Sequence, residues 1–268
     1  MGIDRTVIGQ LGAVWAELAA LGHQLSDEEW AAPTECPGWS VADNLAHLLG
    51  TESVLAGRPN PPAVEAPYVK NPIGELNEAW VGSWRGRPPA ELLAAFEAVT
   101  AERLATLEAM TDEELERPGP SPIGQVPYAT FMEVRLMDCW VHEQDMRRAV
   151  GRPGDEDSPA AEVSIDRLLG SLGVVVGKRA AAPEGATVVL ELTGPVERVR
   201  GLVVVGGRAQ LAGATAAPTV HLRTDSQTFV RLNTGRLAGR EAEAQGLVTL
   251  DGDTELGHRV LDNLAAMI

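Results

Sequence analysis

The spacing of apolar residues changes partway along the chain and predicts two domains of different architecture. Before residue 154, apolar side chains recur at intervals of three and four residues, which is the period of amphipathic helices. After residue 159, short runs rich in valine, leucine and threonine predict strands between helices. The acidic segment 154–159 contains glycine and proline and is the predicted linker. We therefore expect a helical domain over residues 1–153 and a small α+β domain over residues 160–268.

The first domain contains four segments with helical periodicity, and four helices joined by loops predict a four-helix bundle. Ser40 and Asp43 have the spacing of a capping box, which marks the start of the second helix. Two stretches rich in proline and glycine are predicted to be loops: 118–127, and 58–88, which is predicted to surround a short segment near Trp80 and Trp84. The four helices are predicted over residues 3–22, about 40–57, about 89–109 and about 128–150.

The second domain alternates helical and strand-like segments, which is typical of an α+β fold. A helix is predicted over residues 160–179, a second helix begins at Asp225, and a last helix covers 253–266. The predicted strands cover residues 187–192, 196–205, 209–211, 219–222 and 247–250.

The charge balance restricts the partners that the chain can bind. Lysine and arginine number 22 against 38 aspartates and glutamates, a net charge of −16. Such a surface repels phosphate backbones and anionic lipids, so we expect no nucleic acid and no membrane partner. The sequence has no apolar run long enough to cross a membrane and no secretory leader, which predicts a cytoplasmic protein. Its two cysteines, Cys36 and Cys139, are interpreted as small buried residues.

Three side chains have the types and spacing of a metal site. Asp138 and His142 lie four residues apart on one predicted helix, so both project from the same face. His47 lies on a polar face of another predicted helix. If these two helices are neighbours, His47, Asp138 and His142 form a site of two histidines and one carboxylate with open coordination positions, which suits a catalytic divalent metal.

Other interpretations of the same residues remain open. An aspartate and a histidine four residues apart often form only a surface ion pair, and His47 has the alternative of a hydrogen-bonded buried histidine. Glu133 and Glu143 are alternative ligands, whereas Asp145 lies where it would orient the ring of His142 from outside the metal sphere.

Two groups of arginines are considered for a role in binding. The first group lies at the end of a predicted helix, where cations interact favourably with the helix dipole, and the second lies in the α+β domain, where one arginine would hold an anionic substrate. The first group is Arg147, Arg148 and Arg152, and the second is Arg223, Arg231, Arg236 and Arg240.

The segment 34–48, TECPGWSVADNLAHL, closely resembles the signature of the mycothiol-dependent maleylpyruvate isomerase family. This family is an actinobacterial branch of the DinB-like metal-dependent thiol transferases. Residues 138–145, DCWVHEQD, resemble its second signature, and residues 228–237, TFVRLNTGRL, are similar to its sterol-carrier-like second domain. Only two of the 22 cationic residues are lysines, which indicates a coding bias toward G and C and agrees with an actinobacterial source.

The resemblance implies a DinB-like four-helix bundle that holds a divalent metal, usually zinc, with mycothiol as the thiol cosubstrate. The family's ligands correspond to His47, Asp138 and His142, although the characterised isomerase has glutamate where this chain has Asp138. The family's substrate-binding arginine corresponds best to Arg236. A small electrophilic molecule is the implied substrate, and the implied state is a monomer or homodimer.

The implied activity is that of a metal-dependent, mycothiol-using S-transferase or cis–trans isomerase. In a transferase, the thiolate attacks an electrophilic carbon and remains bound to it as a thioether. In an isomerase, the thiolate adds to an activated cis double bond, the bond rotates, and elimination returns the thiol. Two alternatives stay open: a non-catalytic protein that binds a small ligand, and a metal-dependent hydrolase that uses metal-bound water.

Overall fold

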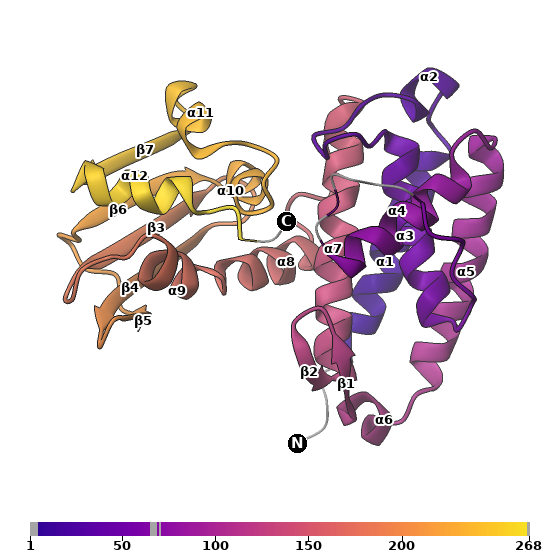
Figure 1. The fold of residues 1–268 in the computed structure, drawn as a ribbon, viewed down its shortest axis with the longest axis horizontal. Coiled ribbons are helices and arrows are strands. Elements are labelled where there is room, and N and C mark those ends of the chain that lie inside the picture. The colour runs from indigo at the N-terminus through magenta and orange to yellow at the C-terminus, as the bar shows by residue number, and fades with distance from the viewer. Residues whose placement is uncertain (1–4, 65–68, 70, 267–268) are drawn as a thin grey trace. The chain divides into compact units, whose positions relative to one another are not determined.

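The structure is a computed structural model that describes residues 5–64, 69 and 71–266. It divides into two compact units, Met1–Asp155 and Glu156–Ile268. Figure 1 shows that the first unit is almost entirely helical, whereas the second combines a sheet with helices. The protein therefore has a mixed helix-and-sheet fold.

Long helices lie at the four periodic segments of the first unit. Helix α1 packs against α5 and α7, and α3 packs against the same two helices. Each helix therefore buries its apolar face against two others. Their bounds are α1 (Thr6–Gly22), α3 (Val41–Leu55), α5 (Pro89–Ala109) and α7 (Tyr128–Ala149).

The predicted capping box at the start of α3 is confirmed. The Ser40 side chain accepts a hydrogen bond from the backbone N–H of Asp43, and the Asp43 carboxylate accepts one from the Ser40 N–H at 2.9 Å. Arg85 donates to the same carboxylate at 3.0 Å. The cap fixes where α3 begins.

The segment predicted near Trp80 and Trp84 is the end of a longer helix, α4 (Pro72–Trp84), so the prediction of a loop is wrong for residues 72–79. The Asn71 side chain caps this helix by accepting from the N–H of Gly74, and Pro72 occupies the first helical position, where proline is favourable. Gly50 of α3 allows α4 to approach closely, because a Cβ at this position would lie 2.5 Å from Trp80. The other prolines of residues 58–88 favour a loop, so the cap at Asn71 and the proline at the first helical position were not recognised as a helix start. Residues 65–68 and 70 lie outside the described residues.

Residues 118–127, predicted to be a loop because of their prolines, form a short hairpin. Its strands are β1 (Pro118–Ser121) and β2 (Gly124–Pro127). Two short helices of this unit lack enough residues to show a helical period, and we did not predict them. They are α2 (Asp27–Trp30) and α6 (Asp112–Glu116).

The second unit contains a five-stranded sheet in the order β5-β4-β3-β6-β7. Strands β3 and β6 are parallel, and the other neighbours are antiparallel. The aliphatic residues of β3 and β6 are buried and form part of the core. The strands are β3 (Thr187–Thr193), β4 (Arg198–Val205), β5 (Arg208–Ala212), β6 (Val220–Asp225) and β7 (Val248–Gly252).

The predicted helix over 160–179 is not continuous, because it breaks after Leu169 into shorter segments. Asp225 caps the next helix as expected. The helical segments are α8 (Pro159–Leu169), α9 (Leu172–Val174), the π-helical turn η1 (Val175–Arg179), α10 (Ser226–Asn233), the unpredicted α11 (Gly239–Ala244) and α12 (Thr254–Asp262). The resemblance of this unit to sterol carriers stays a prediction.

Among the described residues, no helix combines the length and the apolar composition that a membrane-spanning segment requires.

We expect Gly50→Ala to destabilise the first unit, because the added methyl group has no space beside Trp80. Overpacking of this kind costs about 1–3 kcal/mol in the free energy of unfolding, measurable by urea denaturation. Gly9→Ala is the matched control, since Gly9 is an exposed α1 residue with no atom within 4 Å of the added Cβ. The control should be neutral or stabilising by up to about 1 kcal/mol. Equal stabilisation by both substitutions would contradict the close approach of α3 and α4.

Candidate metal centre

Helices α3 and α7 bring together the three residues singled out in the sequence. His47 projects from α3, and Asp138 and His142 lie one turn apart on α7. One ligand atom from each of the three lies within 4.8 Å of the others. Nε2 of His47 is 3.2 Å from Oδ2 of Asp138, and Nε2 of His142 is 3.7 Å from Oδ1. Both histidines are buried, whereas the Asp138 side chain is 29% exposed, so the centre opens to solvent at Asp138.

A series of buried charges holds the Asp138 carboxylate. Arg135, one turn earlier on α7, donates to Asp138 and also to the buried Glu52 of α3 at 3.0 Å. Glu52 accepts a further bond from Arg103 of α5 at 3.1 Å. Burial alone raises the pKa of Asp138, but the guanidinium of Arg135 and the adjacent histidines hold this pKa well below its usual range. Asp138 is therefore an anion across the physiological pH range.

The other side of His142 is lined by hydrogen-bonding groups. Its Nδ1 lies 2.7 Å from Oδ1 of Asn44, 3.3 Å from Oδ2 of Asp145 and 3.9 Å from the sulfur of Cys36. Burial opposes the charged form, but the hydrogen bonds to Asp145 and Cys36 and the charge of Asp138 raise the pKa of His142 to about 9. Burial instead lowers the pKa of His47.

The aromatic ring of Trp39 lies beside both histidines. Trp39 was not predicted from the sequence to be part of the site. Its ring centroid lies 5.2 Å from that of His47 and 5.8 Å from that of His142. The indole N–H donates to the buried carboxylate of Glu78 at 2.7 Å, which fixes the ring. The available signal was its position directly before the cap of α3, within the family-like segment 34–48.

The alternative ligands lie elsewhere. Glu143 is buried and pairs with Arg147 at 2.6 Å, and burial, aided by the charge of Asp155, raises the pKa of Glu143 to about 8. Glu133 is half-buried and belongs to neither group of metal-ligating side chains found among the described residues. Asp145 contacts His142, as its spacing suggested.

Both cysteines are buried, as expected. Cys139 also receives a hydrogen bond from Arg135 at 3.5 Å, so a positive charge lies close to it that the sequence did not indicate. Burial nevertheless raises the pKa of the Cys139 thiol to about 12, so Cys139 is an unreactive thiol at neutral pH.

The arginines near the end of α7 form ion pairs. Arg147 pairs with Glu143, Arg148 with Asp145 at 2.6 Å, and Arg152 with Glu29 at 2.7 Å. Arg236 lies in the second unit, directly after α10, where its guanidinium donates to the carbonyl of Thr234 at 2.7 Å. Its role toward a substrate stays a prediction.

The donor set fits a divalent metal such as zinc. Two imidazoles and a carboxylate held as an anion are the ligand types that zinc binds in catalytic sites, with further positions left for water or substrate. Nε2 of His47 is the nitrogen that faces the carboxylate of Asp138, at 3.2 Å, whereas its buried Nδ1 has no hydrogen-bond partner among the described residues. The three residues are therefore suited to hold such an ion.

Comparison with known proteins gives relatives for both the sequence and the fold. The family model of the mycothiol maleylpyruvate isomerase N-terminal domain matches residues 11–147. An uncharacterized protein of Mycobacterium tuberculosis is 32% identical over 149 residues, which are 54% of this chain and 56% of the relative. The chain thus spans little more than half the length of this relative. A second uncharacterized protein of the same organism is 25% identical over 166 residues, which are 59% of this chain and 72% of that protein.

Two crystal structures of the mycothiol-dependent maleylpyruvate isomerase share the fold at 16% sequence identity. That of a mutant has a TM-score of 0.56 and covers 93% of each chain. The other has a TM-score of 0.54 and covers 88% of this chain and 90% of the isomerase. The match to the family model spans just over half of the chain and includes His47, Asp138 and His142. The chain therefore belongs to the family defined by the mycothiol maleylpyruvate isomerase N-terminal domain.

Proposed function

We propose that this protein is a metal-dependent, mycothiol-using enzyme that catalyses either S-transfer to a small electrophile or a cis–trans isomerisation of the maleylpyruvate type. His47, Asp138 and His142 hold the metal, and zinc is the ion that we propose. The first unit then acts as a DinB-like four-helix bundle, and the sterol-carrier-like second unit contributes Arg236 toward an anionic substrate. The observation that carries the proposal is the convergence of these three ligand atoms within 4.8 Å inside the family-matching segment.

A divalent metal at this centre would lower the pKa of a bound thiol, so that thiolate is present at neutral pH. The protein's own groups support this chemistry. Arg135 keeps Asp138 ionised and oriented, and burial of His47 favours the neutral imidazole that a metal requires. The exposed edge of Asp138 leaves an approach for the cosubstrate, and the indole ring of Trp39 lies against the two histidine rings.

Metal content is the first test. Purified protein should contain one equivalent of a divalent metal, measured by elemental analysis. His47→Ala and Asp138→Ala should each weaken zinc binding by at least about tenfold in calorimetry, because each removes a direct ligand. His23→Ala is the matched control, since His23 is exposed and pairs with Glu97 at the surface at 2.8 Å. Wild-type protein that takes up no metal would refute the proposal and favour a ligand-binding role.

Activation of the thiol is tested by cobalt substitution. Adding mycothiol to the Co²⁺-loaded protein should produce a thiolate-to-cobalt charge-transfer band, because a soft sulfur ligand joins the nitrogen and oxygen donors. Cobalt-loaded His142→Ala should show no such band. A wild-type spectrum that mycothiol leaves unchanged would exclude thiol activation at this centre, and turnover of an ester in the absence of any thiol would favour the hydrolase.

The metal-free protein and the metal complex should respond to pH in opposite directions. The folded-state pKa of His142 is about 9 against 6.5 for an unperturbed histidine, so the protonated ring stabilises the metal-free fold fully below pH 6.5. This contribution is lost as pH rises through 9. Over the same interval a metal displaces the ring proton, so zinc affinity should rise by up to about tenfold per pH unit.

Thermal unfolding of metal-free protein and zinc calorimetry at several pH values measure the two trends. His142→Asn should flatten the trend in metal-free stability. A melting temperature of the wild-type metal-free protein that does not fall between pH 6.5 and 9 would contradict the raised pKa.

A further inference from the structure

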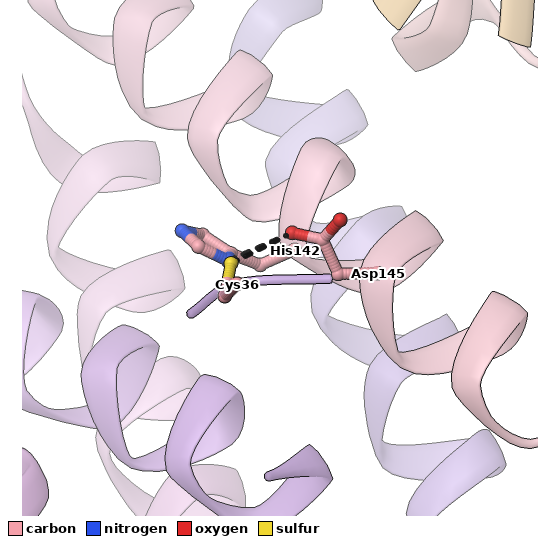
Figure 2. A group of neighbouring side chains, drawn as sticks. All are labelled: Cys36, His142 and Asp145. Carbon is pink, nitrogen blue, oxygen red and sulfur yellow. Dashed lines mark hydrogen bonds and ion pairs between the residues drawn. The ribbon is translucent and has the colours of Figure 1, made fainter. Parts of the chain in front are cut away.

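Among the described residues, two groups of side chains could hold a metal ion, and both include His142. One group is His47, Asp138 and His142, and the other is Cys36, His142 and Asp145. Figure 2 shows the second group: one ring nitrogen of His142 lies beside the sulfur of Cys36 and the carboxylate of Asp145, whereas the other nitrogen points away from both. A neutral imidazole has one proton and one lone pair, so only one side of the ring can bind a metal.

The orientation of the Asn44 amide decides which nitrogen carries the proton. The Nδ2 of Asn44 donates to the backbone carbonyl of Ser40 at 2.9 Å and to Oγ1 of Thr34 at 3.0 Å. A carbonyl oxygen can only accept, so the NH₂ group must face Ser40 and the amide oxygen must face His142. That oxygen lies 2.7 Å from Nδ1 of His142. Nδ1 must therefore be the donor.

Asp145 adds a second acceptor on the same side. Its Oδ1 receives a bond from Arg148 at 2.6 Å, and its Oδ2 lies 3.3 Å from Nδ1 of His142 and 3.3 Å from the sulfur of Cys36. Asp145 and Asn44 are both fully buried, so this arrangement is protected from competing water. The Cys36 thiol donates a hydrogen bond to this carboxylate.

We propose that Asn44 and Asp145 are positioning residues that hold the proton of His142 on Nδ1, so that the metal binds only at Nε2, and that Cys36 is not a metal ligand. This assignment rests on the proposed metal-dependent function and deepens it. It also has a chemical consequence. A protein thiolate bound to the ion would supply negative charge and weaken the activation of the cosubstrate thiol. Because the Cys36 thiol is hydrogen-bonded to Asp145 and does not bind the ion, a coordination position stays open for the cosubstrate thiol.

Nitrogen-15 NMR of the histidine rings in the zinc-loaded wild-type protein tests the assignment without any substitution. The expected spectrum of His142 shows a proton on Nδ1 and zinc on Nε2, because the two tautomers have distinct nitrogen shifts and couplings. Zinc on Nδ1 of His142 would overturn the proposal. Protein that binds no zinc would instead refute the proposed function, and this assignment with it.

Two substitutions separate positioning from ligation. Asn44→Ala should weaken zinc binding by about 10- to 100-fold, as for other groups that orient a ligand, and should broaden or split the His142 Nδ1–H signal. Cys36→Ala should change zinc affinity by less than about threefold, well below the tenfold or greater loss expected for a direct ligand. The cobalt-loaded wild-type protein should show no thiolate band before a thiol is added.

A Cys36→Ala variant that loses zinc binding tenfold or more, or a thiolate band in cobalt-loaded wild type without added thiol, would overturn the assignment. Asn44→Ala with unchanged zinc affinity and an unchanged His142 signal would overturn the role of Asn44. If Asn44→Ala does not fold, the wild-type NMR and the Cys36→Ala comparison still decide the question.

Discussion

The buried ion pairs around Glu52 organise the helical unit. Glu52 of α3 contacts Arg103 of α5 and Arg135 of α7, and all three side chains are almost completely buried. Removing one member of such a network leaves an uncompensated charge and typically costs about 3–5 kcal/mol. The network therefore fixes how α3 and α7 align with each other. Because His47 lies on α3 and Asp138 on α7, the same alignment brings these two side chains together.

The network also sets the electrostatics of the centre. Glu52 and Asp138 carry two negative charges, and Arg103 and Arg135 carry two positive charges, so these four side chains are balanced. A divalent cation beside neutral histidines would add charge that these four side chains do not neutralise. In a buried environment, such excess positive charge favours an anionic ligand. A thiolate is such a ligand, which makes the charge balance consistent with thiol chemistry.

Local patterns in the sequence were enough to predict which three side chains meet at the candidate metal centre. The four-residue spacing of Asp138 and His142 places them on one face of α7, and the capping box at Ser40 fixes the start of α3. Asp145 was predicted beside His142 from its three-residue spacing, but the contacts of Glu52 and Asn44 were not predicted, because they join distant segments. The pairing of Glu52 with Arg135 spans 83 positions, and that of His142 with Asn44 spans 98. No periodicity or local motif indicates such pairs.

The same limit explains the errors in the fold. Residues 58–88 contain so many prolines that the cap and first turn of α4 were not recognised. The contact of α4 with α3 at Gly50 depends on tertiary packing, which a local pattern does not indicate. The long helices, by contrast, have enough turns for their apolar period to be clear. Periodicity thus predicts the long helices that carry the site residues, whereas buried polar contacts determine the chemistry of the site.

The most direct test of the central claim is X-ray absorption at the zinc edge of the metal-loaded protein, recorded before and after mycothiol is added. Our account predicts two imidazole nitrogens and carboxylate or water oxygens without sulfur in the first spectrum, and one sulfur scatterer near 2.3 Å in the second, within about 0.1 Å. Sulfur already present before the thiol is added, or no sulfur after it, would contradict the account.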